Sequence, residues 1–330
     1  SVFIQGVEPG MCDRETTGDA RWDVARNVVS ESDGYERSVA GVDIEAIRTG
    51  LGTGPNHVLA LTDARFTLSS CKVGFPMRSH TTVGEQQVIL ACVTRAPVGS
   101  RWCEMDLHAG DVIVYGPGAA HTGMATPGFE FSFAIMTIGE VQRIADESEL
   151  HVRLPPPGQV HKLATTAASR RALAAIPGLA TVAHERRTGL ESQCDEVAHA
   201  MVQALGDPDR FERIGTTSRI DSRDVVHECI GFAGAVARIP SISELCKVAH
   251  VSERRLREAF ADEFAMPPTL YFRDWALDEC HRRLRAARPD TATVTGVAAD
   301  MGFAHLGRFS GYYRGLYGEC PSSTLRSVAS

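Results

Sequence analysis

Several features that would place this chain in a specialised class of protein are absent from its 330 residues. No apolar run reaches the roughly 18 residues that a membrane-spanning helix needs, so we expect no membrane partner. The first residues lack a basic region followed by an apolar core, which predicts a cytoplasmic protein rather than a secreted one. The 9 cysteines are odd in number and form no Cys-x-x-Cys pair, which argues against a disulfide framework or a zinc ribbon.

Excess positive charge is also missing, because the formal net charge is −7. The charge is unevenly distributed, however, since the chain from Pro240 onward contains 12 Lys and Arg residues against 11 Asp and Glu residues. An acidic front and a near-neutral, arginine-containing end are compatible with a sensor joined to a DNA-binding part. The length favours two domains over one.

Short β-type segments dominate the first 155 residues. From about residue 35 onward, β-branched and aromatic residues alternate or cluster between breaks that contain Gly, Pro or Asn, as in HVLALTDARFTLSSCKVG, EQQVILACVT, DVIVYGP and FEFSFAIMTI. Roughly eight short strands without a long helix between them predict an antiparallel sandwich or barrel.

One segment of this region, LHAGDVIVYGPGAAH at 107–121, resembles the second cupin motif. The shared positions are Gly110, Asp111, Gly118 and His121. The resemblance implies a cupin-like β-barrel, and a barrel of this size encloses room for one small molecule.

The first cupin motif is only half present, because His80 follows Gly74 but Thr82 stands where the second His is expected. A metal site needs three or four converging ligands, which His80, Glu85 and His121 would have to supply. We therefore expect a metal-free effector pocket without a cofactor, and a metal-dependent cupin-type enzyme with an appended helical region is the alternative. No nucleophile–base pair or phosphate loop suggests other catalysis, so we expect no enzyme. The candidate effector-binding residues are Arg78, His80, Glu85, Trp102 and His121.

Residues 156–220 are predicted to form a helical dimerisation or linker region. The Pro-Pro-Pro-Gly run at 155–158 predicts the end of the β region. Helices are predicted over 161–176, 191–205 and 222–238, and the second of them carries an apolar stripe. That stripe is expected either to pack back on the β domain or to pair with a second subunit.

A two-helix pattern occurs twice near the C-terminal end of the sequence. The first copy begins at a capping box formed by Ser241 and Glu244, and the second begins near Val294. Each copy ends in large apolar residues at i and i+4, and the two pairs are offset by 53 residues: Leu256 with Phe260, and Phe309 with Tyr313. A repeated helix–turn–helix with basic residues early in its second helix is the geometry that enters the major groove of DNA, although each copy alone is also compatible with a solvated basic face.

A long helix predicted over 268–287 separates the two copies. Its 20 residues would span roughly 30 Å, and one turn of B-DNA measures about 34 Å. The spacer therefore has about the right length to hold two reading helices in successive major grooves.

Residues 225–326 resemble the DNA-binding domain of AraC/XylS-type transcriptional regulators. The signature positions are Val297, Ala298, Gly302, Phe303, Phe309, Ser310, Arg314, Gly318, Pro321 and Ser322. The His-Leu-Gly run at 305–307 is similar to the ethanolamine-operon-regulator branch. The resemblance implies an activator, often a homodimer, that responds to a small-molecule effector and has double-stranded DNA and RNA polymerase as partners.

The candidate DNA-binding residues are Arg254, Arg255, Arg257, Glu258, His305, Gly307, Arg308, Ser310 and Gly311. The second copy departs from the family pattern in a row of glycines at 307, 311 and 315, each of which costs a helix about 0.5–1 kcal/mol relative to Ala. Either the backbone there approaches DNA or another helix closely, or this copy reads bases weakly. We predict that the first copy carries more base specificity.

The sequence thus predicts an α+β multidomain protein with three parts. Residues 1–155 form a cupin-like sensor domain with helices, 156–220 the helical region, and 221–330 an all-α domain of two helix-turn-helix units joined by a long helix. The function it favours is a ligand-responsive, sequence-specific DNA-binding regulator. An architectural DNA-binding protein without an effector is a further alternative.

Overall fold

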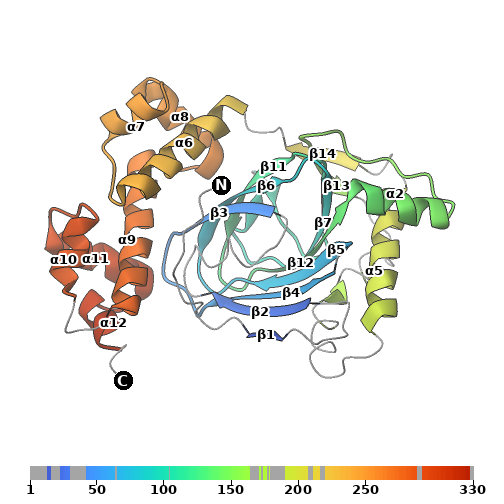
Figure 1. Cartoon of the computed structure of the whole chain (residues 1–330), viewed down its shortest axis with the longest axis horizontal. Helices are drawn as coiled ribbons and strands as arrows, with labels where there is room; N and C mark the ends of the chain where they lie inside the picture. Colours follow the sequence, from blue (N-terminus) through green and yellow to red (C-terminus); the bar gives the residue numbers. More distant parts are fainter. Residues whose placement is uncertain are drawn as a thin grey trace.

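The computed structural model describes residues 13–15, 23–29, 42–63, 65–103, 105–163, 171, 174–176, 178, 190–206, 211–215, 220–287 and 292–327. Strands dominate the first part of this range and helices make up the last part, so a β domain lies beside an all-helical domain (Figure 1). This is the α+β division that the sequence predicts. No helix in the described ranges is long and apolar enough to cross a membrane.

Two antiparallel sheets make up the β domain. The larger sheet contains, in spatial order, β1 (Asp13–Glu15), β2 (Asp23–Val29), β4 (Asn56–Thr62), β5 (Phe66–Lys72), β12 (Glu130–Thr137), β7 (Gln87–Arg95), β10 (Val112–Tyr115), β13 (Val160–Leu163) and β14 (Phe211–Gly215). The smaller sheet contains β3 (Val42–Arg48), β6 (Met77–Val83), β11 (Ala120–Ala125), β8 (Arg101–Trp102) and β9 (Met105–Asp106). Among the strands described, no pairing closes the two sheets into one ring, so the cupin-like domain is a two-sheet sandwich.

The larger sheet is buried on both faces, as its interior strand β7 shows. Leu90 and Cys92 belong to an outer apolar core, whereas Ile89 and Ala91 belong to an inner core between the two sheets. Side chains alternate between the faces of a strand, so a strand buried on both faces needs a continuous apolar run. The sequence VILACV supplies such a run.

Helices α2 (Ile138–Glu147) and α5 (Leu190–Leu205) cover the outer face of the larger sheet, on the side away from the helical domain (Figure 1). Val197 and Met201 of α5 are buried in the outer core together with strand residues such as Leu90. The apolar stripe of α5 therefore packs back on the β domain, which decides between the two alternatives that the sequence left open.

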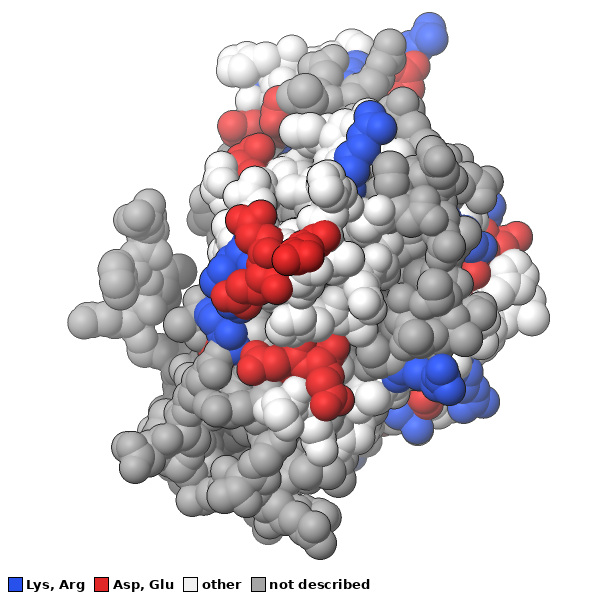
Figure 2. All heavy atoms as spheres, turned by 90° about the vertical axis from the view of Figure 1, so that its right-hand side faces the viewer, with Lys and Arg blue, Asp and Glu red and all other residues white. Residues whose placement is uncertain are grey.

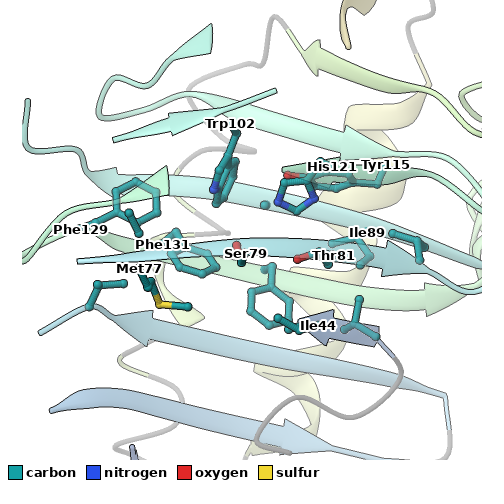
Figure 3. Close-up of a pocket in the computed structure, with 16 residues that line it drawn as sticks. Ile44, Met77, Ser79, Thr81, Ile89, Trp102, Tyr115, His121, Phe129 and Phe131 are labelled. Atoms are coloured by element: carbon teal, nitrogen blue, oxygen red, sulfur yellow. The ribbon is translucent and has the colours of Figure 1, made fainter. Parts of the chain in front are cut away.

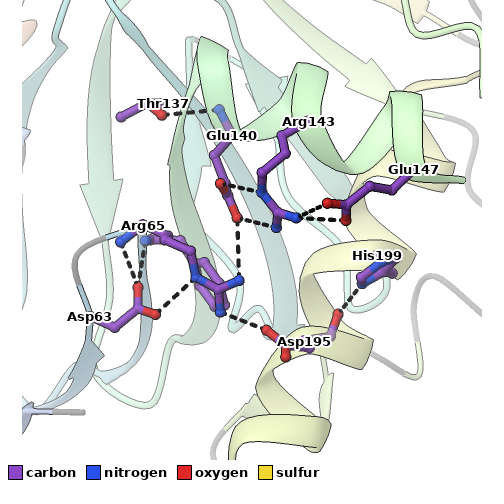
Figure 4. Close-up of polar contacts among 9 residues, drawn as sticks. Asp63, Arg65, Thr137, Glu140, Arg143, Glu147, Asp195 and His199 are labelled. Atoms are coloured by element: carbon purple, nitrogen blue, oxygen red, sulfur yellow. Dashed lines mark hydrogen bonds and ion pairs between the residues drawn. The ribbon is translucent and has the colours of Figure 1, made fainter. Parts of the chain in front are cut away.

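Arg65 ties both helices to the sheet (Figure 4). Its guanidinium lies 2.7 Å from a carboxylate oxygen of Asp195 on α5 and 3.6 Å from one of Glu140 on α2. Arg143 extends the network along α2 by pairing with Glu140 and Glu147. Acidic side chains gather on this face of the molecule (Figure 2), which makes it an unfavourable surface for a phosphate backbone.

Two predictions for the middle of the chain are wrong. The first residues of the helix predicted over 161–176 instead form strand β13, which pairs with β10 so that Leu163 lies opposite Val112, whereas residues 171, 174 and 176 are helical. The proline run does not end the β region either, because β13 and β14 extend the larger sheet beyond it. Helix α2 was not predicted. Most of 164–189 lies outside the described residues.

The helical domain consists of two three-helix groups joined along α9 (Pro268–Ala286). One group lies toward one end of α9 and contains α6 (Ile220–Val236), α7 (Ile242–Val248) and α8 (Glu253–Phe264). The other lies toward the opposite end (Figure 1) and contains α10 (Val294–Asp300), α11 (Leu306–Tyr317) and α12 (Pro321–Ser327). Each group has its own apolar core, and α9 contributes residues to both.

Candidate nucleic-acid interface and internal pocket

The first helix-turn-helix unit consists of α7 and α8, and local side chains fix where each helix begins. The Ser241 hydroxyl accepts a hydrogen bond from the Glu244 backbone, and the Glu244 carboxylate accepts one from the Ser241 backbone N–H at 2.8 Å. A hydrogen bond from Arg238 lowers the pKa of Glu244 to about 2, so this carboxylate stays charged. His250 in the turn has a φ of +53°, and Ser252 caps α8. The predicted capping box is confirmed.

One side of helix α8 is buried, and the opposite side is exposed and contains charged residues. Phe260 is fully buried in the core of its unit. On the exposed side, Arg254 Nε lies 2.9 Å from Glu258 Oε1, and Arg257 Nη2 lies 2.5 Å from Glu253 Oε1. Exposed pairs of this kind contribute only about 0–1 kcal/mol, so an arginine can exchange its partner for a phosphate or a base at little cost.

Arg255 lies apart from the other candidate residues of α8. Its Nη2 donates a hydrogen bond to Ser222 Oγ on α6 at 2.9 Å, and its Nη1 lies 3.9 Å from Asp262 Oδ2. This arginine therefore holds α8 against α6, and its side chain does not lie on the exposed side of α8.

The second helix-turn-helix unit consists of α10 and α11, and glycines replace several side chains on its second helix. Phe309 and Tyr313 are fully buried, as predicted from their i, i+4 spacing. Gly302 forms the turn with a φ of +90°. The candidate residues His305, Gly307, Arg308 and Gly311 are exposed, and Ser310 is partly buried.

The glycine row on α11 is open. A Cβ built on Gly307, Gly311 or Gly315 meets no atom within 4 Å, so no other helix of the described chain packs against this row. Close packing against a neighbouring helix within the chain therefore does not explain the glycines. An approach to DNA and weak base reading remain as the explanations.

Helix α9 sets the separation of the two units. Its 19 residues correspond to about 28 Å, close to the roughly 30 Å predicted from the sequence and to the roughly 34 Å of one DNA turn. Near its C-terminal end, Arg282 and Arg283 both pair with Glu279.

An internal pocket lies in the β domain between the two sheets (Figure 3). Its lining comprises Val42, Ile44, Val73, Met77, Ser79, Thr81, Val83, Ile89, Ala91, Trp102, Tyr115, His121, Ala125, Phe129, Phe131 and Phe133. Of the five candidate effector residues, only Trp102 and His121 line it. Ser79, Thr81 and Tyr115 were missed, because they lie on other strands than Trp102 and His121 and only the pairing of the strands shows that they share a face.

Strand pairing explains which candidates face the pocket. His121 of β11 lies opposite Thr81 of β6, and both line the pocket, because paired residues in adjacent strands point to the same face. Thr122 lies opposite His80, so His80 points to the other face of the sheet, as does Arg78. Glu85 is exposed in the turn after β6.

A family model described as a helix-turn-helix domain matches residues 245–327. A XylDLEGF operon transcriptional activator from Pseudomonas putida is 36% identical over 86 residues, which cover 26% of this chain and 27% of that relative. A probable thc operon regulatory protein from Rhodococcus erythropolis is 29% identical over 105 residues, or 32% of each chain. Residues 245–327 are an AraC/XylS-type helix-turn-helix domain.

Solved structures with a detectable likeness include a probable AraC family transcriptional regulator from Rhodopseudomonas palustris. It is 30% identical, with a TM-score of 0.29, over 32% of this chain and 97% of that one. ToxT from Vibrio cholerae is 8% identical, with a TM-score of 0.32, over 93% of this chain and 98% of that one. The match covers only 27% of the length of the first curated relative.

The AraC/XylS-type domain is docked on the outer face of the smaller sheet. Arg78 Nη1 donates a hydrogen bond to the backbone oxygen of Phe264, at the end of α8, at 2.5 Å. His80 Nδ1 lies 2.6 Å from Glu263 Oε2, close enough for an ion pair although the angle is not that of a hydrogen bond. Burial of the Arg78 guanidinium lowers its pKa. Two residues predicted to bind the effector thus join the domains instead.

Strand β3 makes contacts with both units of the AraC/XylS-type domain. Ile47 is buried in the core of the first unit. The guanidinium of Arg48 lies 4.5 Å from the ring centre of Phe75 in the β domain and 4.8 Å from that of Tyr317 on α11. These contacts join segments far apart in the sequence, and no sequence pattern indicated them.

The three residues of the metal alternative do not converge. His80 faces the AraC/XylS-type domain, His121 faces the pocket, and Glu85 lies in the exposed turn. Within the described ranges no group of three or more His, Cys, Asp and Glu residues is placed to hold a metal ion.

Proposed function

We propose that this protein is a ligand-responsive, sequence-specific DNA-binding transcriptional regulator. The observation that carries the proposal is the pair of helix-turn-helix units with exposed second helices, joined by a helix of about the length of one DNA turn. Such an arrangement suits successive major grooves on one side of the duplex.

The first unit supplies most of the base specificity in this proposal. Arg254 and Arg257 lie on the exposed side near the start of α8, where arginine can form paired hydrogen bonds to guanine, and Glu258 lies beside them. At α11, the side chains of Arg308, Ser310 and the N-cap residue His305 lie among glycines that offer no side chain. The second unit is therefore proposed to contact mainly the DNA backbone.

The effector is proposed to act through β6, because this strand has a different role on each face. Ser79 and Thr81 line the pocket, whereas Arg78 and His80 contact the end of α8. A ligand that shifts β6 would change the docking of the first reading unit. This coupling favours a regulator over an architectural protein without an effector.

The direction of regulation and the partners follow from the relatives and the family resemblance. The Pseudomonas putida relative is named a transcriptional activator, so we propose activation, with RNA polymerase as a partner and the cytoplasm as the location. A homodimer is also proposed, on a surface other than the apolar stripe of α5, which the β domain already covers. We expect no enzymatic activity, and stoichiometric iron, manganese or zinc in the purified protein would contradict this.

The test is to select a binding site from random duplex DNA with the full chain and then measure its affinity at several salt concentrations. Arg254→Ala and Arg257→Ala are each expected to weaken specific binding by about 5- to 150-fold and to relax the sequence preference. Arg308→Ala should weaken all sequences alike and reduce the salt slope by about 1. Arg101→Ala, an exposed arginine on β8, is the charge-matched control. Failure to select any sequence would refute the proposal, and a larger loss of specificity for Arg308→Ala would refute the assignment of readers.

A further inference from the structure

The internal pocket has no charged side chain in its lining. Its polar side chains are Ser79, Thr81, Tyr115 and His121, and every other lining residue is apolar apart from the indole N–H of Trp102. An ionised ligand would lose its hydration there without gaining an opposite charge, which costs several kcal/mol or more. The pocket therefore selects against organic anions and cations.

Two polar atoms at the pocket have no hydrogen-bond partner among the described residues. They are the hydroxyl of Tyr115 and Nδ1 of His121, whose rings lie 4.8 Å apart between centroids. Buried polar atoms of this kind are normally satisfied, so both atoms are available to hydrogen-bond with a ligand group. Burial lowers the pKa of His121 to about 3 and raises the pKa of Tyr115 well above its ordinary value, so both side chains are neutral at neutral pH.

Aromatic side chains form much of the remaining wall. Trp102 packs edge-to-face with Phe129 at 5.6 Å and with Phe131 at 5.2 Å (Figure 3). Phe131 also stacks on Phe133. Walls of this kind contact a flat ring through stacked and edge-to-face geometry. The cavity volume is about 60 Å³, several times the roughly 10–15 Å³ that one water needs, so the pocket suits a small molecule.

We propose that the effector is a small, neutral ring compound whose single hydroxyl or carbonyl group hydrogen-bonds with Tyr115 and His121. The inference rests on the proposed function, because it names the ligand class of the same regulatory pocket. Arg78 and His80 supply no positive charge to this pocket, since both of those side chains face the AraC/XylS-type domain.

The first arm of the test compares three ring compounds of similar size on the purified full chain at pH 7, with calorimetry as the readout. Benzyl alcohol is neutral and carries a hydroxyl, toluene is neutral without a polar group, and benzoate is anionic. Benzyl alcohol is expected to bind more tightly than toluene and at least about 100-fold more tightly than benzoate. Benzoate binding as tightly as benzyl alcohol, or no binding of any probe, would overturn the inference.

The second arm uses Tyr115→Phe and His121→Phe. Each is expected to weaken benzyl alcohol binding by about 2- to 10-fold and to leave toluene binding unchanged, which also shows that the pocket has kept its shape. His108→Phe, at an exposed histidine outside the pocket, is the matched control. An equal loss for toluene and benzyl alcohol in both variants would overturn the assigned hydrogen bonds.

The failure of this inference differs from the failure of the proposed function. If no probe binds but the chain still binds DNA in a sequence-specific way, the proposed ligand class is refuted and the proposed DNA-binding function stands. Benzyl alcohol binding that leaves DNA affinity unchanged supports the ligand class and refutes the proposed coupling through β6.

Discussion

The buried contact between His80 and Glu263 permits a quantitative prediction about how the two domains are held together. The side chains are 7% and 1% exposed, and the closest atoms are 2.6 Å apart. We consider His80→Leu, Glu263→Leu and the double variant. Leucine fills most of the space of either side chain, so the main change is the loss of one polar partner.

The two single variants are expected to differ because the remaining partner differs. Removing one partner of a buried ion pair costs about 3–5 kcal/mol when a charged group is left behind without compensation. An imidazole that loses its partner leaves one unsatisfied polar atom, which costs about 1–3 kcal/mol. His80→Leu leaves a buried carboxyl group and should lower the free energy of unfolding by about 3–4 kcal/mol. Glu263→Leu leaves an imidazole and should cost about 1–2 kcal/mol.

The assay is urea denaturation of the full chain at pH 7, followed by circular dichroism. The double variant should lose about 2–3 kcal/mol less than the sum of the single variants, because neither partner is left alone. Lys72→Leu serves as the control, since Lys72 pairs with Glu130 at 3.3 Å on the surface and should cost less than about 1 kcal/mol. A larger loss for Glu263→Leu than for His80→Leu, or strictly additive losses, would refute the reasoning.

Three further predictions concern the helical domain. Ser241→Ala should lower the free energy of unfolding by about 1 kcal/mol because it removes the cap of α7, and Ser241→Thr should retain most of it in the same denaturation assay. Gly311→Ala should raise the thermal midpoint, with a gain of about 0.5–1 kcal/mol, because a Cβ there meets nothing within 4 Å; a loss of stability would show that the row is packed. Burial holds the pKa of His281 at about 3 in the folded state, whereas an unfolded histidine titrates near 6.5. As the pH falls, the unfolded chain therefore takes up this proton before the folded chain does. The free energy of unfolding should be unaffected by His281 above about pH 6.5 and should fall by up to about 1.4 kcal/mol per pH unit toward pH 3. The free energy of unfolding of His281→Gln, measured over the same pH range, should fall with a shallower slope.

The helix-turn-helix units could be predicted from the sequence because the signals that define them are local. A cap and its backbone target lie three residues apart, as for Ser241 and Glu244, and a buried helix face repeats at three to four residues, as for Phe309 and Tyr313. The length of α9 follows directly from a proline at its start and an uninterrupted helical pattern. These properties depend on neighbours along the chain, so no knowledge of the tertiary structure was needed.

The β domain was predicted in kind but not in detail. The strands around β7 and β12 were visible as β-branched and aromatic clusters, whereas β13 was mistaken for a helix. Four residues that form a strand have no periodicity of their own to set them apart, and β13 is defined by its pairing with β10. That pairing joins segments whose proximity only the tertiary structure decides.

The roles of Arg78, His80, Trp102 and His121 mark the boundary between the two kinds of information. The sequence by itself placed these four side chains in a β-rich region and named them together as effector candidates. Which face encloses a pocket and which face receives the AraC/XylS-type domain depends on the register of β6 against β11, and a shift of one residue would exchange the two sets. The sequence therefore determined the reading helices and their spacing, and the tertiary structure decided which side chains hold the ligand and which hold the domains together.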